Sequence, residues 1–308
     1  MKRLIRPAML LVPLISGVCF PGLHIFASAP YNFIRWALCV MIFINVLQIE
    51  VRDLKPCREH FILLAANILI GVVPFFLLKY IYPASVIPAQ AAFFAGIAPT
   101  AAAAAVIVSL LNGRVGFVVT GFMISNIGIS IALLFLLPVV TGNLTAAFFL
   151  TVLESLVTVI AIPLTAAQIV RRFFPGILKY RGKLKNLTLV LWSLSLLIIA
   201  SVAGNFFRNN AGNSTGFAVF SVVLAFLICA GNFSIGYWLG RPGYRRDTSQ
   251  MLGQKNTTFA IFIALEYSRG AAALTTIAYV LFHNLWNSIQ LFTAKSRNNS
   301  DGNDLKKQ

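Results

Sequence analysis

Apolar runs separated by short polar connections occur along almost the whole chain. About ten of them approach or exceed the roughly 20 residues that a helix needs to cross a bilayer. They cover residues 9–28, 31–50, 60–82, 87–112, 115–140, 145–170, 186–206, 215–240, 248–266 and 271–292. A lipid-spanning segment must satisfy its own backbone hydrogen bonds, so runs of this length predict helices and not the shorter alternating strands of a membrane barrel. The pattern therefore predicts an all-α polytopic membrane protein with about ten transmembrane helices, the first of them an uncleaved helix and not a signal peptide.

The composition agrees with this pattern. Of the 308 residues, 58% are hydrophobic and 11% are charged, against about 25% charged residues in a soluble domain. Most of the surface must therefore face a lipid bilayer. The four cysteines are scattered and form no metal-type pair. We therefore predict that they act as small buried apolar side chains, and we predict no metal site and no cofactor. No nucleotide loop or nucleophile–base set appears at usable spacing, and an enzyme is not predicted.

The formal net charge of +17 is distributed unevenly between the connections. Basic residues gather at the two ends of the chain and in every second connection: Lys2, Arg3, Arg6, Arg52, Lys55, Arg58, Arg114, Arg171, Arg172, Lys179, Arg181, Lys183, Lys185, Arg241, Arg245, Arg246, Lys295, Arg297, Lys306 and Lys307. The other connections hold only Lys79, Arg208 and Arg269. By the positive-inside rule both termini are cytoplasmic, in the inner or plasma membrane of the cell. The basic surplus is thus a topology signal, with attraction to anionic lipid as a by-product, and nucleic acid is not predicted as a partner.

The basic connection RRFFPGILKYRGKLK divides the crossings into two sets of five. An odd number of crossings reverses the orientation of the second set, so two related halves form an inverted repeat, which is a common transporter plan. We therefore predict a first five-helix repeat at 1–170, a cytoplasmic basic linker at 171–185, a second repeat at 186–293 and a polar cytoplasmic tail at 294–308.

The fourth crossing of each half is interrupted. Gly96 and Pro99 break the first of these crossings, and the polar run from Gly253 to Asn256 breaks the second. Discontinuous helices in corresponding positions indicate a transporter binding site, because helix N-termini attract anions and exposed carbonyl ends attract cations. The alternative for the first break is an ordinary proline kink, which membrane helices tolerate.

Three stretches resemble motifs of the bile acid:sodium symporter family. They are GIAPTAAAAAVIVSLLNGRVGFVVT at 96–120, GYWLGRPGYRRDTSQMLGQKNTTFAIFIAL at 236–265 and YVLFHNLWNSI at 279–289. The family has a Pro-Gly-Gly stretch followed by Ser-Asn at the first, a Glu-x-Gly-x-Gln-Asn motif at the second and an aromatic-His-Asn ending at the third. The resemblance extends over about residues 8–293. It implies two crossed discontinuous helices within a core domain of crossings three to five and eight to ten. It also implies a panel domain of the other crossings, and coupling of sodium entry to organic-anion uptake.

The sequence departs from the family where the resemblance places sodium ligands. Ala104 and Ala105 take the Ser-Asn positions, Met251 takes the glutamate position and Lys255 takes the glutamine position. Sodium requires oxygen ligands, as other hard cations do, and alanine and methionine side chains have none. We therefore predict a divergent member with dismantled sodium sites, in which the Lys255 ammonium stands in for the bound cation and donates to nearby carbonyls.

The predicted substrate-binding residues lie at the two breaks: Pro99, Thr100, Gln254, Lys255, Asn256 and Thr257. Two other readings of Lys255 are open, a lysine that snorkels to the membrane interface and a lysine paired with Glu154 on the sixth crossing. Glu154 itself is a candidate charge partner, a proton site or a carboxylate facing a wet cleft. His283 and Asn284 match the third stretch, with helix packing as the alternative to substrate contact.

These observations predict a secondary transporter of a small organic anion that works by alternating access without the usual sodium coupling. One alternative is a non-transporting membrane receptor or sensor on the same fold. Another is a sodium-coupled symporter whose ligands are backbone carbonyls. The identity of the substrate, the direction of transport and the oligomeric state are not encoded in any motif of the chain.

Overall fold

In the computed structural model of the protein, the described residues are 12–13, 15–27, 30–209, 214–268 and 270–304. Within these ranges the chain is overwhelmingly helical and contains no β-strand. The start of the predicted first crossing, at 9–11, and the end of the predicted tail, at 305–308, lie outside the described residues.

Five helical stretches in the described part of the chain are long and apolar enough to span a membrane. Their outward faces carry large apolar side chains, such as Leu69, Phe135 and Leu227, which are 57%, 61% and 59% exposed. A continuous apolar surface of this extent is not stable in water, so it indicates an all-α membrane protein. The helices that form these stretches are α3 (Arg58–Ile81), α6 (Val115–Thr141), α7 (Ala146–Leu156) with α8 (Ile162–Phe173), α9 (Arg181–Asn209) and α10 (Ser214–Leu239).

The remaining elements are shorter or less regular than the apolar pattern predicts. The segment predicted as the first crossing changes near Pro21 from α-helix at 15–19 to a 3₁₀ helix, η1 (Pro21–Ala27), because proline lacks the N–H that an α-helix needs. The sixth crossing contains one π-helical turn, η3 (Val157–Ala161). Helix α13 (Ala273–Asp304) continues beyond the predicted crossing into the polar tail. The other elements are α2 (Phe33–Leu47), η2 (Val51–Asp53), η4 (Pro175–Tyr180) and η5 (Gly270–Ala272).

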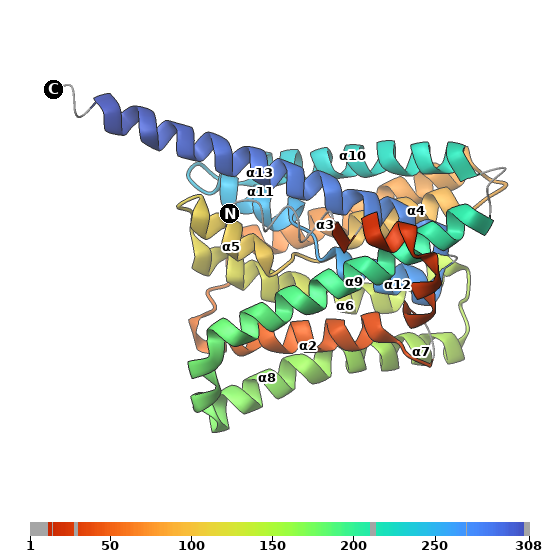
Figure 1. Ribbon diagram of the computed structural model, residues 1–308, viewed down its shortest axis with the longest axis horizontal. Helices are drawn as coiled ribbons and strands as arrows, with labels where there is room; N and C mark the ends of the chain where they lie inside the picture. The colour runs from red at the N-terminus through yellow and green to blue at the C-terminus, as the bar shows by residue number, and fades with distance from the viewer. Residues whose placement is uncertain (1–11, 14, 28–29, 210–213, 269, 305–308) are drawn as a thin grey trace.

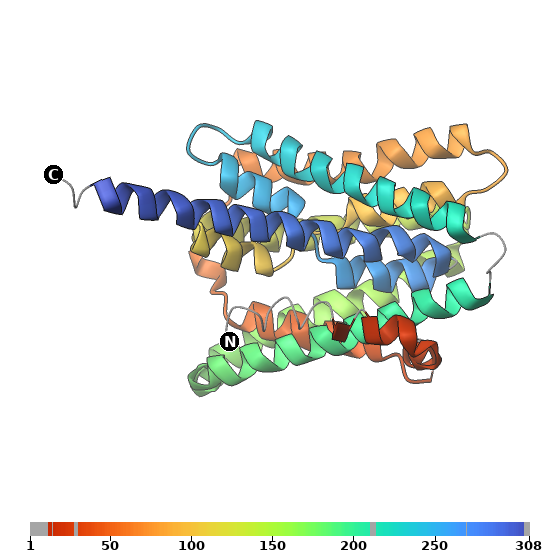
Figure 2. The ribbon, with the colours of Figure 1, turned by 45° about the horizontal axis from the view of Figure 1, so that its top comes forward.

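The helices form two packed groups. Helices α2, α8 and α9 pack together with η1 on one side of the molecule, whereas α10 packs on α11 and α13, and α3 packs on α4, on the other (Figures 1 and 2). A shared apolar cluster joins the groups and includes Leu38 of α2, Phe94 of α4 and Phe259 of α12. The two groups therefore meet around the interrupted helices.

Both predicted interruptions are present as breaks between short helices. The fourth run forms α4 (Ile87–Ile97) and α5 (Ala103–Leu110), and the ninth forms α11 (Arg245–Gly253) and α12 (Thr257–Tyr267). At the first break, Ala98 has φ −47° and ψ 134°, the extended conformation to which a following proline drives a residue. At the second, the Asn256 side chain caps α12 by accepting a hydrogen bond from the N–H of Phe259 at 3.2 Å.

Hydrogen bonds and ion pairs connect the end of α2 to α8. Arg171 donates to the Leu47 carbonyl at 2.9 Å and to the Glu50 carboxylate at 2.6 Å, and Arg52 donates to the same carboxylate at 2.5 Å. The hydrogen bond from Arg171, followed by that from Arg52, holds the pKa of Glu50 below its usual range. The orphan carbonyl at the end of α2 is thereby satisfied by a cation.

Candidate functional site

The two breaks meet inside the protein as a short antiparallel bridge, here called the crossing (residues 98–102 and 254–256). The bridge joins Thr100 and Lys255. Two backbone hydrogen bonds flank it, from the N–H of Ala101 to the Gln254 carbonyl at 2.8 Å and from the N–H of Asn256 to the Pro99 carbonyl at 2.7 Å. Each broken segment thus supplies partners that the other lost when its helix stopped, as buried irregular backbone requires.

Lys255 lies at the carbonyl end of α4. Its side chain is buried, with 1% of the residue exposed, and Nζ donates to the Gly96 carbonyl at 3.0 Å and to Oδ1 of Asn67. Gly96 is in the last turn of α4, where carbonyls lack intrahelical partners and the helix dipole is negative. Asn67 also donates to the Ala98 carbonyl at 3.1 Å and so ties the same helix end to α3. In this structure the lysine does not snorkel, because it is held by these two acceptors inside the protein.

The carbonyl end of α11 is satisfied in the reciprocal way. Thr100, from the first break, donates its hydroxyl to the Met251 carbonyl at 2.7 Å. Tyr279 of α13 donates to the Gly253 carbonyl at 2.8 Å and accepts from the Asn232 amide at 3.1 Å. Both helix ends that would attract a cation therefore carry protein donors, an ammonium at α4 and hydroxyls at α11.

Apart from Lys255, the positions at which the resemblance implies sodium ligands carry apolar side chains in the structure. Ala104 and Met251 belong to one buried cluster together with Val118 and Leu252. The Met251 side chain packs directly on α6, since a Cβ added to Gly121 would lie 1.8 Å from Met251 Cε. The thioether thus fills the space beside α6 and presents no oxygen to a hard cation.

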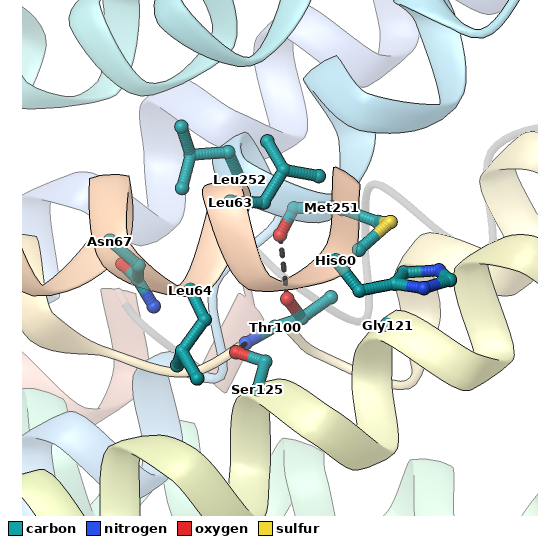
Figure 3. Close-up of a pocket in the computed structure, with 9 residues that line it drawn as sticks. All are labelled: His60, Leu63, Leu64, Asn67, Thr100, Gly121, Ser125, Met251 and Leu252. Atoms are coloured by element: carbon teal, nitrogen blue, oxygen red, sulfur yellow. Dashed lines mark hydrogen bonds between the residues drawn. The ribbon is translucent and has the colours of Figure 1, made fainter. Parts of the chain in front are cut away.

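A small cavity lies beside the crossing, between α3, α6 and α11 (Figure 3). Its volume of about 10 Å³ is close to the room that one water molecule needs. The Ser125 hydroxyl accepts a hydrogen bond from the N–H of Thr100 at 3.0 Å, and Asn126 donates to the Thr100 carbonyl at 3.0 Å. His60, which also lines the cavity, is bound at both ring nitrogens: Nδ1 accepts from the N–H of Cys57 and Nε2 pairs with the Phe117 carbonyl, each at 3.0 Å.

A row of amide side chains, most of them buried, fixes the side chain of Gln254. Asn287 of α13 donates to Gln254 Oε1 at 2.5 Å, and Gln250 donates to Asn287 at 3.0 Å and to Gln290 at 2.7 Å. The row runs along the contact between α11 and α13. It holds α11 in place relative to α13, and with it the end of α11 that reaches the crossing.

The structure brings the predicted binding residues together at the crossing. Four of them are buried, namely Thr100, Gln254, Lys255 and Thr257, which are 3%, 4%, 1% and 5% exposed. Pro99 and Asn256 contribute the backbone hydrogen bond already described.

Glu154 lies elsewhere. It is exposed on α7, and no ion pair within the described chain joins it to Lys255, whose two acceptors are instead Asn67 and Gly96. His283 is buried on α13, and Asn284 donates to the Val280 carbonyl of its own helix at 2.7 Å.

Several residues of the site were not predicted from the sequence. Ser125 is adjacent to Asn126 inside the mostly apolar α6. Tyr279 and Asn287 flank His283 at spacings of four residues, which places all three on one face of α13. The α13 residues are visible in the sequence as polar positions at helical spacing, and Ser125 and Asn126 as two adjacent polar residues within an apolar run.

The chain matches no family model and no curated protein. The crossing, its buried lysine and the apolar helices therefore define a class of protein on physical grounds alone, an α-helical membrane protein with two interrupted helices that meet at their broken ends.

Proposed function

We propose that this protein is a secondary transporter of a small organic anion that works by alternating access without the usual sodium coupling. The observation that carries the proposal is Lys255, buried at the crossing with its Nζ on the Gly96 carbonyl at 3.0 Å. In this proposal the ammonium is a fixed positive charge at the place where a mobile cation would otherwise bind, in a divergent member of the bile acid:sodium symporter family.

The proposed architecture has ten membrane-spanning segments in two inverted halves of five. The core domain consists of α3 to α6 and α10 to α13, and the panel domain consists of η1, α2, α7 to α8 and α9. The reciprocal caps of the crossing support this plan, since Lys255 caps α4 and Thr100 caps α11. A two-fold relation between the halves accounts for such an exchange of partners between corresponding breaks.

The electrostatic potential at the crossing favours an anionic ligand. Helices α5 and α12 both begin at the crossing, and the N-terminal end of a helix carries partial positive charge. Lys255 adds a positive charge that no described carboxylate pairs with. A carboxylate or sulfonate is the matching chemistry, with its apolar part against the panel domain.

Binding and flux of such an anion are expected to be nearly independent of sodium. The side chains of Met251 and Ala104 offer no oxygen, and the carbonyls of Gly96 and Met251 at the helix ends already accept hydrogen bonds from protein donors. The measurement is a thermal-shift screen of carboxylates and sulfonates, followed by uptake into reconstituted vesicles, with potassium replacing sodium at constant ionic strength. A saturable sodium dependence would show that backbone carbonyls rebuild a sodium site. Ligand binding without flux would assign the fold to a receptor or sensor.

Both termini are expected on the cytoplasmic side, with odd and even connections on opposite sides. In a chain whose four cysteines have been replaced, Asn143→Cys and Arg181→Cys should react with a membrane-impermeant thiol reagent from opposite sides, position 181 from the cytoplasm. Position 143 lies between α6 and α7, and position 181 begins α9. Labelling of both positions from one side would contradict the topology with ten membrane-spanning segments.

A further inference from the structure

The corner between α10 and α11 carries a group of aromatic and basic residues that the transport proposal does not use. We call it the Arg245 corner: Tyr237, Trp238, Arg241 and Arg245. Trp238 is 73% exposed and Tyr237 is 40% exposed. Both lie in the last turn of α10, at the end of an apolar stretch long enough to span the membrane. Tryptophan and tyrosine in that position sit at the level of the lipid headgroups.

Arg245 differs from its neighbours in having aromatic contacts but no anion. Its guanidinium carbon lies 5.4 Å from the Tyr237 ring centroid and 5.7 Å from that of Trp238. No carboxylate in the described part of the chain forms an ion pair with it, and its Nε is buried without a hydrogen-bond partner there. Arg241, by contrast, is paired with Glu59 at 3.1 Å. A guanidinium held between rings and lacking an anion is preorganised for a phosphate or carboxylate.

A row of small residues leads away from this guanidinium along the outward-facing side of α10. The small residues Ala230, Gly231 and Ser234 lie between the exposed Leu227 and Trp238. A Cβ added to Gly231 would meet nothing within 4 Å, so the surface is open at this point. The helix from Leu227 to Trp238 rises about 16 Å, roughly half the 30 Å hydrocarbon core, which is the depth of one leaflet.

We propose that the Arg245 corner is a binding site for an anionic phospholipid. The headgroup phosphodiester accepts hydrogen bonds from Arg245 beside Tyr237 and Trp238, and one acyl chain lies over Ala230, Gly231 and Ser234. Charge complementarity selects an anionic lipid over a zwitterionic one, because no carboxylate of the described residues pairs with Arg245, whereas Arg241 is paired with Glu59. This site is independent of the proposed transport activity.

The test compares Arg245→Gln with Arg246→Gln, which removes the same charge from the adjacent residue, an exposed arginine with no aromatic ring contact among the described ones. Full-length protein is purified from nanodiscs that contain equal phosphatidylglycerol and phosphatidylcholine, and retained lipid is counted by native mass spectrometry. The wild type should retain phosphatidylglycerol preferentially. Arg245→Gln should lower that preference about tenfold, the loss of one charge-assisted hydrogen-bonded contact, and Arg246→Gln less than about twofold.

Equal losses in the two variants would overturn the proposal, because they would reduce the effect to general surface charge. Inorganic phosphate added to phosphatidylcholine nanodiscs provides a second arm. If it raises the unfolding temperature as much as phosphatidylglycerol does, and Arg245→Gln removes that effect, the ligand is free phosphate and not lipid. A stable dimer that Ala230→Leu dissociates would assign this face of α10 to a second copy of the chain and also overturn the lipid assignment.

Discussion

Lys255→Met is expected to abolish ligand binding and flux, by at least about a hundredfold, in a protein that still inserts and folds. The substitution keeps the length of the side chain and removes both hydrogen bonds of Nζ, to Gly96 and to Asn67. In the proposal the ammonium is the fixed positive charge that attracts the anion; a charge-assisted hydrogen bond contributes about 1.5–3 kcal/mol, and the upper end of that range corresponds to about a hundredfold. Uptake into vesicles with a calibrated amount of inserted protein is the measurement.

The unfolding temperature of Lys255→Met should stay close to that of the wild type. Two buried acceptors lose their donor, at a cost of about 1–3 kcal/mol. The cost of burying a cation without a carboxylate partner disappears at the same time, and the two effects oppose each other. Loss of function with retained stability is therefore the result that separates a functional charge from a packing residue. Full transport by Lys255→Met would reduce Lys255 to a residue that fills the crossing.

Two further variants sharpen this experiment. Lys255→Arg keeps the charge, and it should retain part of the function because the larger guanidinium must fit a site that is 1% exposed. Lys255→Gln should not restore sodium dependence alone, since Met251 still lacks a carboxylate. The double change Met251→Glu with Lys255→Gln supplies both an acid and an amide beside the crossing, and is expected to restore it in part.

The two helix breaks were predictable because their causes are local. Pro99 removes a backbone donor and extends Ala98, and both effects follow from the proline ring. The second break follows from the polar run ending in Asn256, which caps α12. Apolar periodicity likewise predicted the long helices, because membrane spans have a length that is set by the bilayer.

The partners of Lys255 were not predictable in the same way. Asn67 is separated from Lys255 by 188 residues in the chain, and helical periodicity fixes which face a residue lies on but not which helix packs there. The pairing with Glu154 is not seen in the structure because Lys255 turns towards α3 and α4. The π-helical turn at Val157–Ala161 and the 3₁₀ segment at Pro21–Ala27 are shifts of hydrogen-bond register, and the first has no compositional signal.

Gly96→Ala is expected to have two effects: it destabilises the fold, and it disturbs the contacts that hold Lys255 at the crossing. Helices α3 and α4 approach each other through glycines, and a Cβ on Gly96 would lie 2.5 Å from the Ile70 carbonyl oxygen and 3.0 Å from Cα of Gly71. The obstruction is backbone, so α4 must move away from α3. Overpacking of this kind costs about 1–3 kcal/mol. The displacement also separates the Gly96 carbonyl from Asn67, which together hold Lys255.

Gly116→Ala is the matched control, because Gly116 is also in a helix and a Cβ there would meet nothing within 4 Å. Gly116 lies in the first turn of α6, where the preference for alanine over glycine is smaller than in a helix interior, so this variant should unfold close to the temperature of the wild type. Thermal unfolding in detergent gives the comparison, and ligand binding at a temperature where both variants are folded gives the effect on the crossing. If Gly96→Ala matched Gly116→Ala in both measurements, the close approach of α3 and α4 would be wrong. The position of Asn67 beside the α4 carbonyl end, on which the site of Lys255 depends, would then be wrong as well.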